Sequence, residues 1–96
     1  MIRVEVRSYG EVLESSRADP DFDPVLSGVD RTAYPILGHL DPYGDTYLNS
    51  MQVTTLKGEI ARAGDRLVPA RFAGDLLALC ELCLADSHRF MRFIGD

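Results

Sequence analysis

The chain has 96 residues, 46% hydrophobic and 26% charged, which is the composition of one small globular domain spanning residues 1–96. Fifteen acidic residues against ten basic ones give a net charge of −5, the opposite sign to the basic face of a nucleic-acid-binding protein. No apolar run approaches a membrane span, and the first residues lack the apolar core of a signal peptide. We therefore expect a cytoplasmic protein that binds neither nucleic acid nor membrane.

Both ends of the chain carry strand patterns. Residues 2–8 alternate apolar and charged side chains, the period of a strand with one buried face. Residues 88–94 alternate in the same way, and their aromatic content favours a strand. Residues 9–16 are too short and too mixed for periodicity to choose between a second strand and a helical turn.

The middle of the chain is rich in proline and acidic residues. Residues 19–30 predict a loop, and residues 33–37 are an apolar stretch whose proline permits an edge strand or a short helical turn. That stretch is expected to bury Ile36 and Leu37. Residues 41–44 have Asp, Pro and Gly at the positions that favour a type I turn.

A first helix is predicted over about residues 46–63. Asp45, Thr46 and Asn49 are alternative N-caps, and Gln52 stands three residues after Asn49, as in a relative of the capping box. If Asn49 lies on the inward face, its amide must be hydrogen-bonded there. The apolar side chains recur at the helical period and share one face: Val53, Leu56, Ile60 and Ala63.

A second helix is predicted over about residues 70–87, opened by Pro69. Its polar side carries four charged residues: Arg71, Asp75, Glu81 and Asp86. Its apolar side is broader and comprises Phe72, Leu76, Leu79, Cys80 and Cys83.

These elements predict an α+β fold, in which a small antiparallel or mixed sheet contains the N- and C-terminal strands and packs on the two helices. Two strands alone are marginally stable. A third strand must therefore come from residues 9–40 or from a second subunit. In the second case the protein is a homodimer whose interface completes the sheet.

Cys80 and Cys83 have the spacing of a redox or metal-binding pair. Reactive pairs of this kind lie at a helix N-terminus, whereas these lie near the middle of a helix on its apolar face. Zinc needs two more ligands, and His39 and His88 are too far apart in sequence to form a tight pair. We expect both cysteines to be buried, reduced and free of metal.

Four aspartates, Asp19, Asp21, Asp23 and Asp30, occupy positions 1, 3, 5 and 12 of a calcium-loop register. Pro24 replaces the glycine required at position 6, and the aspartate at position 12 is too short for bidentate binding. A solvated acidic loop is the favoured interpretation. No metal or other cofactor is predicted for this chain.

Polar residues gather around the predicted turn and the start of the first helix: His39, Asp41, Tyr43, Asp45 and Asn49. They predict either an acid–base, metal-binding or ligand-binding corner or a set of caps and turn formers. No nucleophile motif, phosphate-binding loop, dinucleotide fingerprint or zinc-protease motif accompanies them. A small-molecule-binding protein or small enzyme that uses this corner is therefore the alternative hypothesis.

Leu82 is out of phase with the apolar face of the second helix. At 100° per residue it falls between Asp75 and Asp86, beside Ala78 and Ala85. A single exposed leucine is commonplace. The competing interpretation is that Leu82 anchors a partner protein or a second copy of this chain, while the two aspartates select that partner.

Three segments carry a resemblance: YPIL at residues 34–37, LDPYGDT at residues 40–46 with Asn49 after it, and FIGD at residues 93–96. The pattern resembles that of a group of small bacterial proteins whose activity is uncharacterised. The resemblance covers about half of the chain and implies no activity, cofactor or catalytic residue.

The preferred hypothesis is a non-enzymatic bacterial interaction or regulatory module that covers a basic protein partner. It is an analogy of size and acidity with immunity-type and antitoxin-like proteins. Nine of the ten basic residues are arginine, which suggests a GC-rich bacterial source. A binding module requires an exposed acidic or apolar patch, whereas an enzyme requires a concave pocket where polar groups converge.

Overall fold

The computed structural model describes residues 2–17, 22, 29–65 and 67–95. It contains two helices and four strands, as expected for an α+β fold. In chain order the elements are β1 (Arg3–Ser8), β2 (Glu11–Arg17), the 3₁₀ helix η1 (Leu37–His39), β3 (Asp45–Leu48), α1 (Ser50–Ala63), α2 (Ala70–Leu84) and β4 (Arg89–Ile94).

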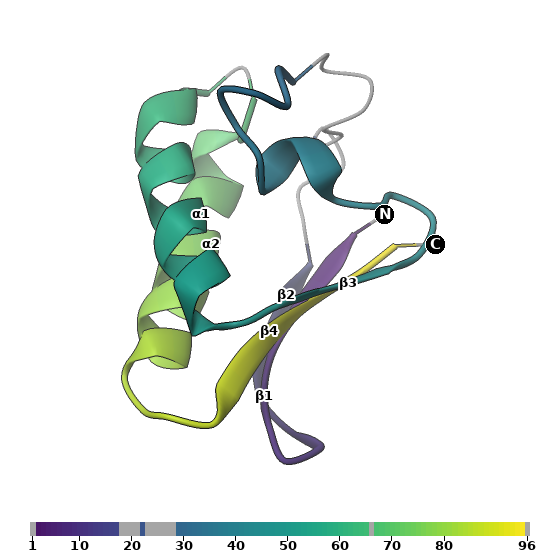
Figure 1. Cartoon of the computed structure of the whole chain (residues 1–96), viewed down its shortest axis with the longest axis vertical. Helices are drawn as coiled ribbons and strands as arrows, with labels where there is room; N and C mark the ends of the chain where they lie inside the picture. Colours follow the sequence, from purple (N-terminus) through teal and green to yellow (C-terminus); the bar gives the residue numbers. More distant parts are fainter. Residues whose placement is uncertain (1, 18–21, 23–28, 66, 96) are drawn as a thin grey trace.

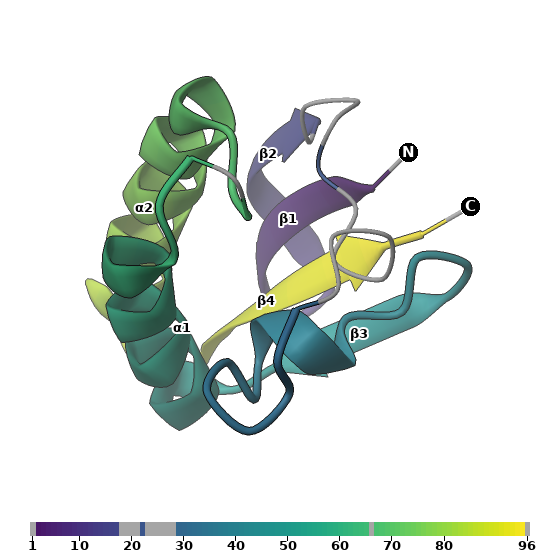
Figure 2. The same cartoon turned by 90° about the horizontal axis from the view of Figure 1, so that it is seen from above.

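The four strands form one antiparallel sheet in the order β2-β1-β4-β3. The first and last strands of the chain are the two central ones, with Val4 opposite Phe93 and Val6 opposite Met91. Both helices lie side by side against the same face of the sheet (Figures 1 and 2). We call this face the inner face and the opposite one the outer face.

The core lies between the inner face and the helices. Val4, Val6, Met91 and Phe93 are completely buried there, as the alternation of the two terminal strands requires. The apolar helix faces predicted from the 3.6-residue period are confirmed, and their buried members are Val53, Leu56, Ile60, Phe72, Leu76, Leu79, Cys80 and Cys83.

The segment that periodicity left undecided is strand β2. Tyr9 and Gly10 both have positive φ, 54° and 87°, which is the conformation of a two-residue hairpin turn. Glycine adopts this conformation without strain, so Gly10 allows the chain to fold straight back along β1. A third strand therefore comes from residues 9–40 of the same chain.

The predicted start of the first helix was wrong. Residues 45–48 form β3, which pairs with β4 through Thr46 opposite Phe93, and the helix begins only at Ser50. Among the alternative N-caps the structure selects Asn49: its side chain accepts a hydrogen bond from Gln52 N at 2.9 Å, and the Gln52 side chain accepts one from Asn49 N at 2.9 Å. Asn49 is exposed and does not point inward.

The second helix also ends earlier than predicted. It stops at Leu84 instead of about residue 87, and residues 85–88 turn the chain towards β4. His88 has a positive φ of 64°, a left-handed conformation that a helix cannot contain. The left-handed residue His88 therefore lies in the turn that leads from α2 into β4.

The apolar stretch at residues 33–37 leads into η1, so the edge-strand alternative is wrong. Leu37 is buried and Ile36 is partly buried. A completely buried carboxylate on α1, Glu59, accepts hydrogen bonds from Ile36 N at 3.0 Å and from Leu37 N at 2.9 Å. These bonds satisfy two amides that the short helix leaves without a partner.

Candidate functional site

The polar corner predicted at residues 39–49 is used for local structure. The Nδ1 atom of His39 lies 2.6 Å from the carbonyl oxygen of Pro35, which accepts a hydrogen bond from it. Asp41 Oδ1 accepts a hydrogen bond from Tyr43 N at 2.9 Å, so the aspartate closes the predicted turn. The ring of Tyr43 is 83% exposed.

The remaining two corner residues point to other elements. Asp45 accepts a hydrogen bond from Arg92 on β4 at 2.6 Å. Asn49, at the opposite end of β3, caps α1. The five predicted residues therefore divide among a turn, a cross-strand ion pair and a helix cap, and their functional groups do not converge on one ligand.

The turn also receives the C-terminal segment. Gly95 N donates a hydrogen bond to Gly44 O at 2.8 Å. A Cβ atom added at Gly95 would meet the backbone of Asp41 and Pro42, so only glycine allows this close approach. Two segments of the pattern described above thus meet in space, and their contact serves the fold.

The three predicted partner residues, Leu82 and Asp75 on α2 and Asp86 just after it, do not form one patch. Leu82 is partly buried and packs against the core, so the expectation that it is exposed on the polar side was wrong. Its carbonyl oxygen accepts a hydrogen bond from Arg89 Nη1 at 2.7 Å, and Asp86 Oδ2 lies 3.8 Å from Arg89 Nη2. Asp75 lies about two turns before Leu82 in α2.

Asp75 instead lines a groove between β2 and α2. We call it the acidic groove; it has a volume of about 320 Å³, and its lining residues are Glu14, Ser15, Ser16, Asp75, Ala78 and Leu79. Glu14 and Ser16 stand opposite Val6 and Val4 of β1, so both lie on the side of the sheet that faces the helices. The sequence did not reveal this groove, because the structure of residues 9–16 was undecided.

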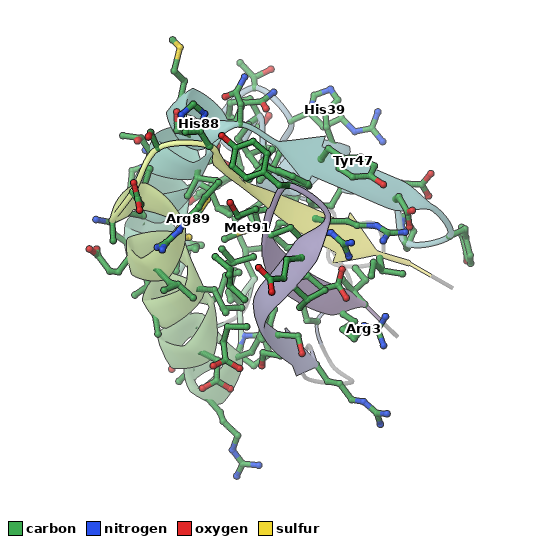
Figure 3. The ribbon with its side chains drawn as sticks, turned by 90° about the horizontal axis from the view of Figure 1, so that it is seen from below. Arg3, His39, Tyr47, His88, Arg89 and Met91 are labelled. Carbon is green, nitrogen blue, oxygen red and sulfur yellow. The ribbon has the colours of Figure 1, made fainter. Side chains whose placement is uncertain are left out.

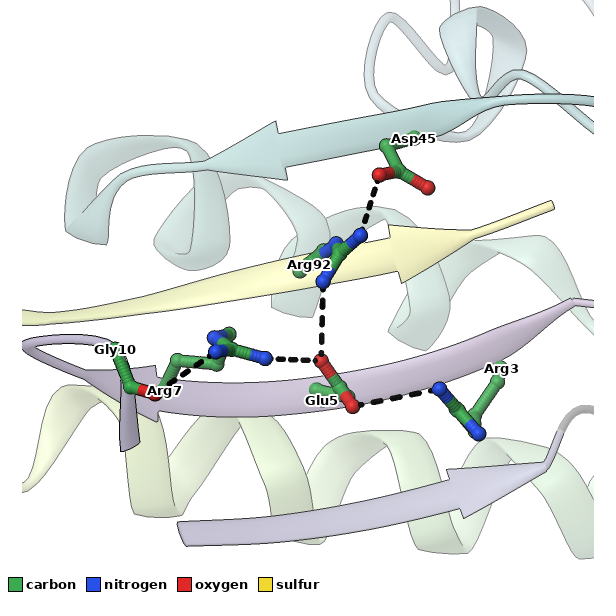
Figure 4. Close-up of polar contacts among 6 residues, drawn as sticks. All are labelled: Arg3, Glu5, Arg7, Gly10, Asp45 and Arg92. Atoms are coloured by element: carbon green, nitrogen blue, oxygen red, sulfur yellow. Dashed lines mark hydrogen bonds and ion pairs between the residues drawn. The ribbon is translucent and has the colours of Figure 1, made fainter. Parts of the chain in front are cut away.

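The outer face of the sheet carries a network of charged side chains (Figure 4). Glu5, only 6% exposed, is its centre. Its carboxylate accepts a hydrogen bond from Arg7 at 2.8 Å and lies 3.6 Å from Arg3 and 3.8 Å from Arg92. Arg92 also donates to Asp45, and this hydrogen bond raises the pKa of Arg92.

Aromatic side chains adjoin this network. Tyr47 on β3 is 56% exposed. The centre of its ring lies 6.0 Å from the centre of the Phe90 ring and 5.6 Å from the guanidinium of Arg92. Figure 3 shows Tyr47 and Arg3 on the side of the sheet away from the helices, whereas Met91 points towards them. No sequence motif marks this face, although alternation alone places Arg3, Glu5 and Arg7 on one side of a strand.

The two cysteines are buried free thiols. Burial, followed by the neighbouring Cys83, raises the pKa of Cys80 to about 12, and burial also raises the pKa of Cys83. Both groups are therefore protonated near neutral pH and are poor nucleophiles. The expectation of buried cysteines is confirmed.

Within the described ranges, no three His, Cys, Asp or Glu side chains gather as a metal site would require. Asp19, Asp21 and Asp23 of the calcium-loop register lie outside the described residues, so the structure does not test that register. Over the same part of the chain, no helix has the length and apolar character needed to cross a membrane.

Comparisons of the chain with protein-family models, with curated proteins and with solved structures find no match. Any proposal for the function therefore rests on the geometry and charge of the acidic groove and of the outer face of the sheet.

Proposed function

We propose that this chain is a small non-enzymatic interaction module of the bacterial cytoplasm, and that the acidic groove receives a basic side chain of a protein partner. The groove is the observation that best supports the proposal, because the carboxylates of Glu14 and Asp75 and the apolar residues Ala78 and Leu79 line the same space. The net charge of −5 supports it further, since an acidic protein attracts basic partners over a long range.

The chemistry of the groove suits an arginine or lysine. The carboxylates of Glu14 and Asp75 and the hydroxyl of Ser16 can accept hydrogen bonds from a guanidinium or ammonium group. Leu79 and Ala78 offer apolar surface to the methylene stem of such a side chain. A groove of about 320 Å³ is at the lower end of small-molecule pockets, a size that matches one long side chain.

Neither of the other hypotheses gains support of this kind. The small-molecule or enzyme hypothesis relied on His39, Asp41, Tyr43, Asp45 and Asn49, four of which already have partners in the fold. The homodimer hypothesis relied on a missing third strand, and one chain supplies four. Partner binding at the acidic groove therefore remains the preferred function.

The test uses a blocked hexa-arginine peptide as the probe and isothermal titration calorimetry at low salt as the measurement. The double variant Glu14→Gln/Asp75→Asn should bind the peptide at least about tenfold more weakly, because two charge-assisted contacts are lost. Glu11→Gln/Asp86→Asn is the matched control. It removes the same charge from β2 and from the turn that follows α2, outside the groove, and it should weaken binding by less than about threefold.

Equal weakening by the two double variants would contradict the proposal, because binding would then depend on net charge instead of the groove. Amide chemical shifts give a second measurement. They should change at Ser16, Asp75 and Ala78 on addition of the peptide, and changes confined to residues 39–49 would favour the alternative hypothesis.

A further inference from the structure

The outer face of the sheet has a charge opposite to that of the chain as a whole. Four arginines point to this side, Arg3 and Arg7 from β1, Arg17 from β2 and Arg92 from β4, against the carboxylates of Glu5 and Asp45. Among the described residues the face is therefore net +2, and the other described residues are net −4. We call this surface the arginine face.

Two of these arginines are direct cross-strand neighbours. Arg3 and Arg17 are paired across β1 and β2, and like charges in this position repel each other. Glu5, the carboxylate beside them, lies 2.8 Å from Arg7 but 3.6 Å from Arg3. An anion between Arg3 and Arg17 would therefore relieve a repulsion that Glu5 compensates only in part.

The arginine face also offers apolar contact area beside its charges. Tyr47 is more than half exposed and Phe90 lies next to it. Tyrosine, phenylalanine and arginine are the residues enriched at the centres of protein interfaces. Both helices lie on the other side of the sheet (Figure 1).

We infer that the arginine face docks an acidic segment of a protein partner, with a carboxylate between Arg3 and Arg17 and an apolar side chain against Tyr47. Guanidinium groups bind carboxylates through paired hydrogen bonds, which fixes the position of the segment along the sheet. This surface lies on the opposite side of the sheet from the acidic groove. The inference is therefore independent of the proposed function.

Two other occupants fit the surface less well. A single-stranded nucleic acid needs cations along its whole backbone, but Arg7 and Arg92 already donate to Glu5 and Asp45. The net charge of −5 of the whole chain also repels a polyanion over a long range. A second copy that packed through the same face would place its arginines against these arginines.

The test uses the full chain, labelled with ¹⁵N, and a blocked peptide of sequence Glu-Glu-Phe-Glu-Glu at low salt. Amide shifts should change along β1, β2 and β3, at Arg3, Arg17 and Tyr47. Arg17→Gln leaves the three partners of Glu5 in place and should weaken the peptide about tenfold. Its matched control, Arg71→Gln on α2, changes the net charge equally and should weaken it by less than about threefold.

Tyr47→Ala tests the apolar contact and should also weaken the peptide, whereas Tyr43→Ala, which removes an exposed tyrosine outside the sheet, should not. Equal effects of Arg17→Gln and Arg71→Gln would overturn the inference, because net charge alone would then explain binding. Tighter binding of a dodecathymidylate through the same residues would also overturn it, in favour of nucleic acid. So would a dimer in sedimentation velocity that Tyr47→Ala dissociates.

Discussion

The two buried glutamates, Glu59 and Glu5, lie on opposite sides of the sheet and are stabilised in different ways. Glu59 belongs to the helix layer, has no exposed surface and accepts hydrogen bonds from the backbone amides of Ile36 and Leu37. Glu5 lies on the outer face, and its partners are arginine side chains that are themselves partly exposed.

This difference in partners gives the two glutamates different roles: Glu59 stabilises the fold, and Glu5 belongs to a charged surface. Backbone amides cannot move away from Glu59 without unfolding η1, so this carboxylate holds residues 36–37 against α1. The arginines around Glu5 are themselves partly exposed, so each can also meet a carboxylate from outside the chain. Changes on the inner side should therefore alter stability most, and changes on the outer side should alter binding most.

The largest effect is expected for Glu59→Leu, which removes both acceptors and leaves two buried amides unsatisfied. It should lower the free energy of unfolding by about 3 kcal/mol, measured by urea denaturation. Glu59→Gln keeps one acceptor oxygen and should lose about half as much. Hydrogen exchange of the Ile36 and Leu37 amides should accelerate in both variants. An unchanged exchange rate at these amides would show that Glu59 does not hold η1.

The next effect concerns Cys80, whose pKa is 9.0 in the unfolded reference and about 12 in the fold. Between these values the folded state keeps a proton that the unfolded chain releases, so stability is lost as the pH rises through this window. The loss should reach about 2 kcal/mol near pH 10.5. The variant Cys80→Ala should be less stable than the wild type at pH 8. Its unfolding free energy, measured by urea denaturation, should not show this part of the pH dependence. Identical pH profiles for the two proteins would contradict the assignment.

A smaller effect is expected on the outer side. Glu5→Gln keeps the size of the side chain but removes the charge that Arg3, Arg7 and Arg92 share. The unfolding free energy should fall by about 1 kcal/mol, and by less at high salt. A loss as large as that of Glu59→Leu would show that the two glutamates do not differ as described.

The smallest effect is expected for Asp45→Asn. Its carboxylate pairs with Arg92 at the edge of the sheet and is one-third exposed, so the variant should lose about 0.5 kcal/mol. Because Arg92 would then be less neutralised, the acidic peptide should bind somewhat more tightly. Weaker binding of the peptide to Asp45→Asn would argue against an anionic partner on the arginine face.

Features that depend on neighbours in sequence were predictable. The alternation of residues 2–8 and 88–94 places both strands correctly, because one buried face imposes a period of two. The helical period identifies every buried residue of α2, including Cys80 and Cys83. Gln52 three residues after Asn49 indicated the capping box, although Asp45 and Thr46 remained alternatives until β3 was seen.

The partners of Glu59 could not be predicted from local sequence. Glu59 lies three residues after Leu56 on the apolar face of α1, a sign of a buried charge, but its partners are more than twenty residues away in sequence. No local pattern gives the position of a backbone amide relative to a distant helix. The partial burial of Leu82 has the same cause, since contact with the core depends on how α2 is set against the sheet.

The sequence by itself determined the class of fold, the terminal strands and the inward faces of both helices, because burial imposes a short-range period on each element. Only the tertiary structure decided that residues 45–48 pair with β4 and that Glu14 and Asp75 share a groove. It also decided that four arginines meet on one side of an acidic protein. The register between the two ends of the chain sets these juxtapositions, and that register is a property of the assembled sheet, which no local window of sequence contains.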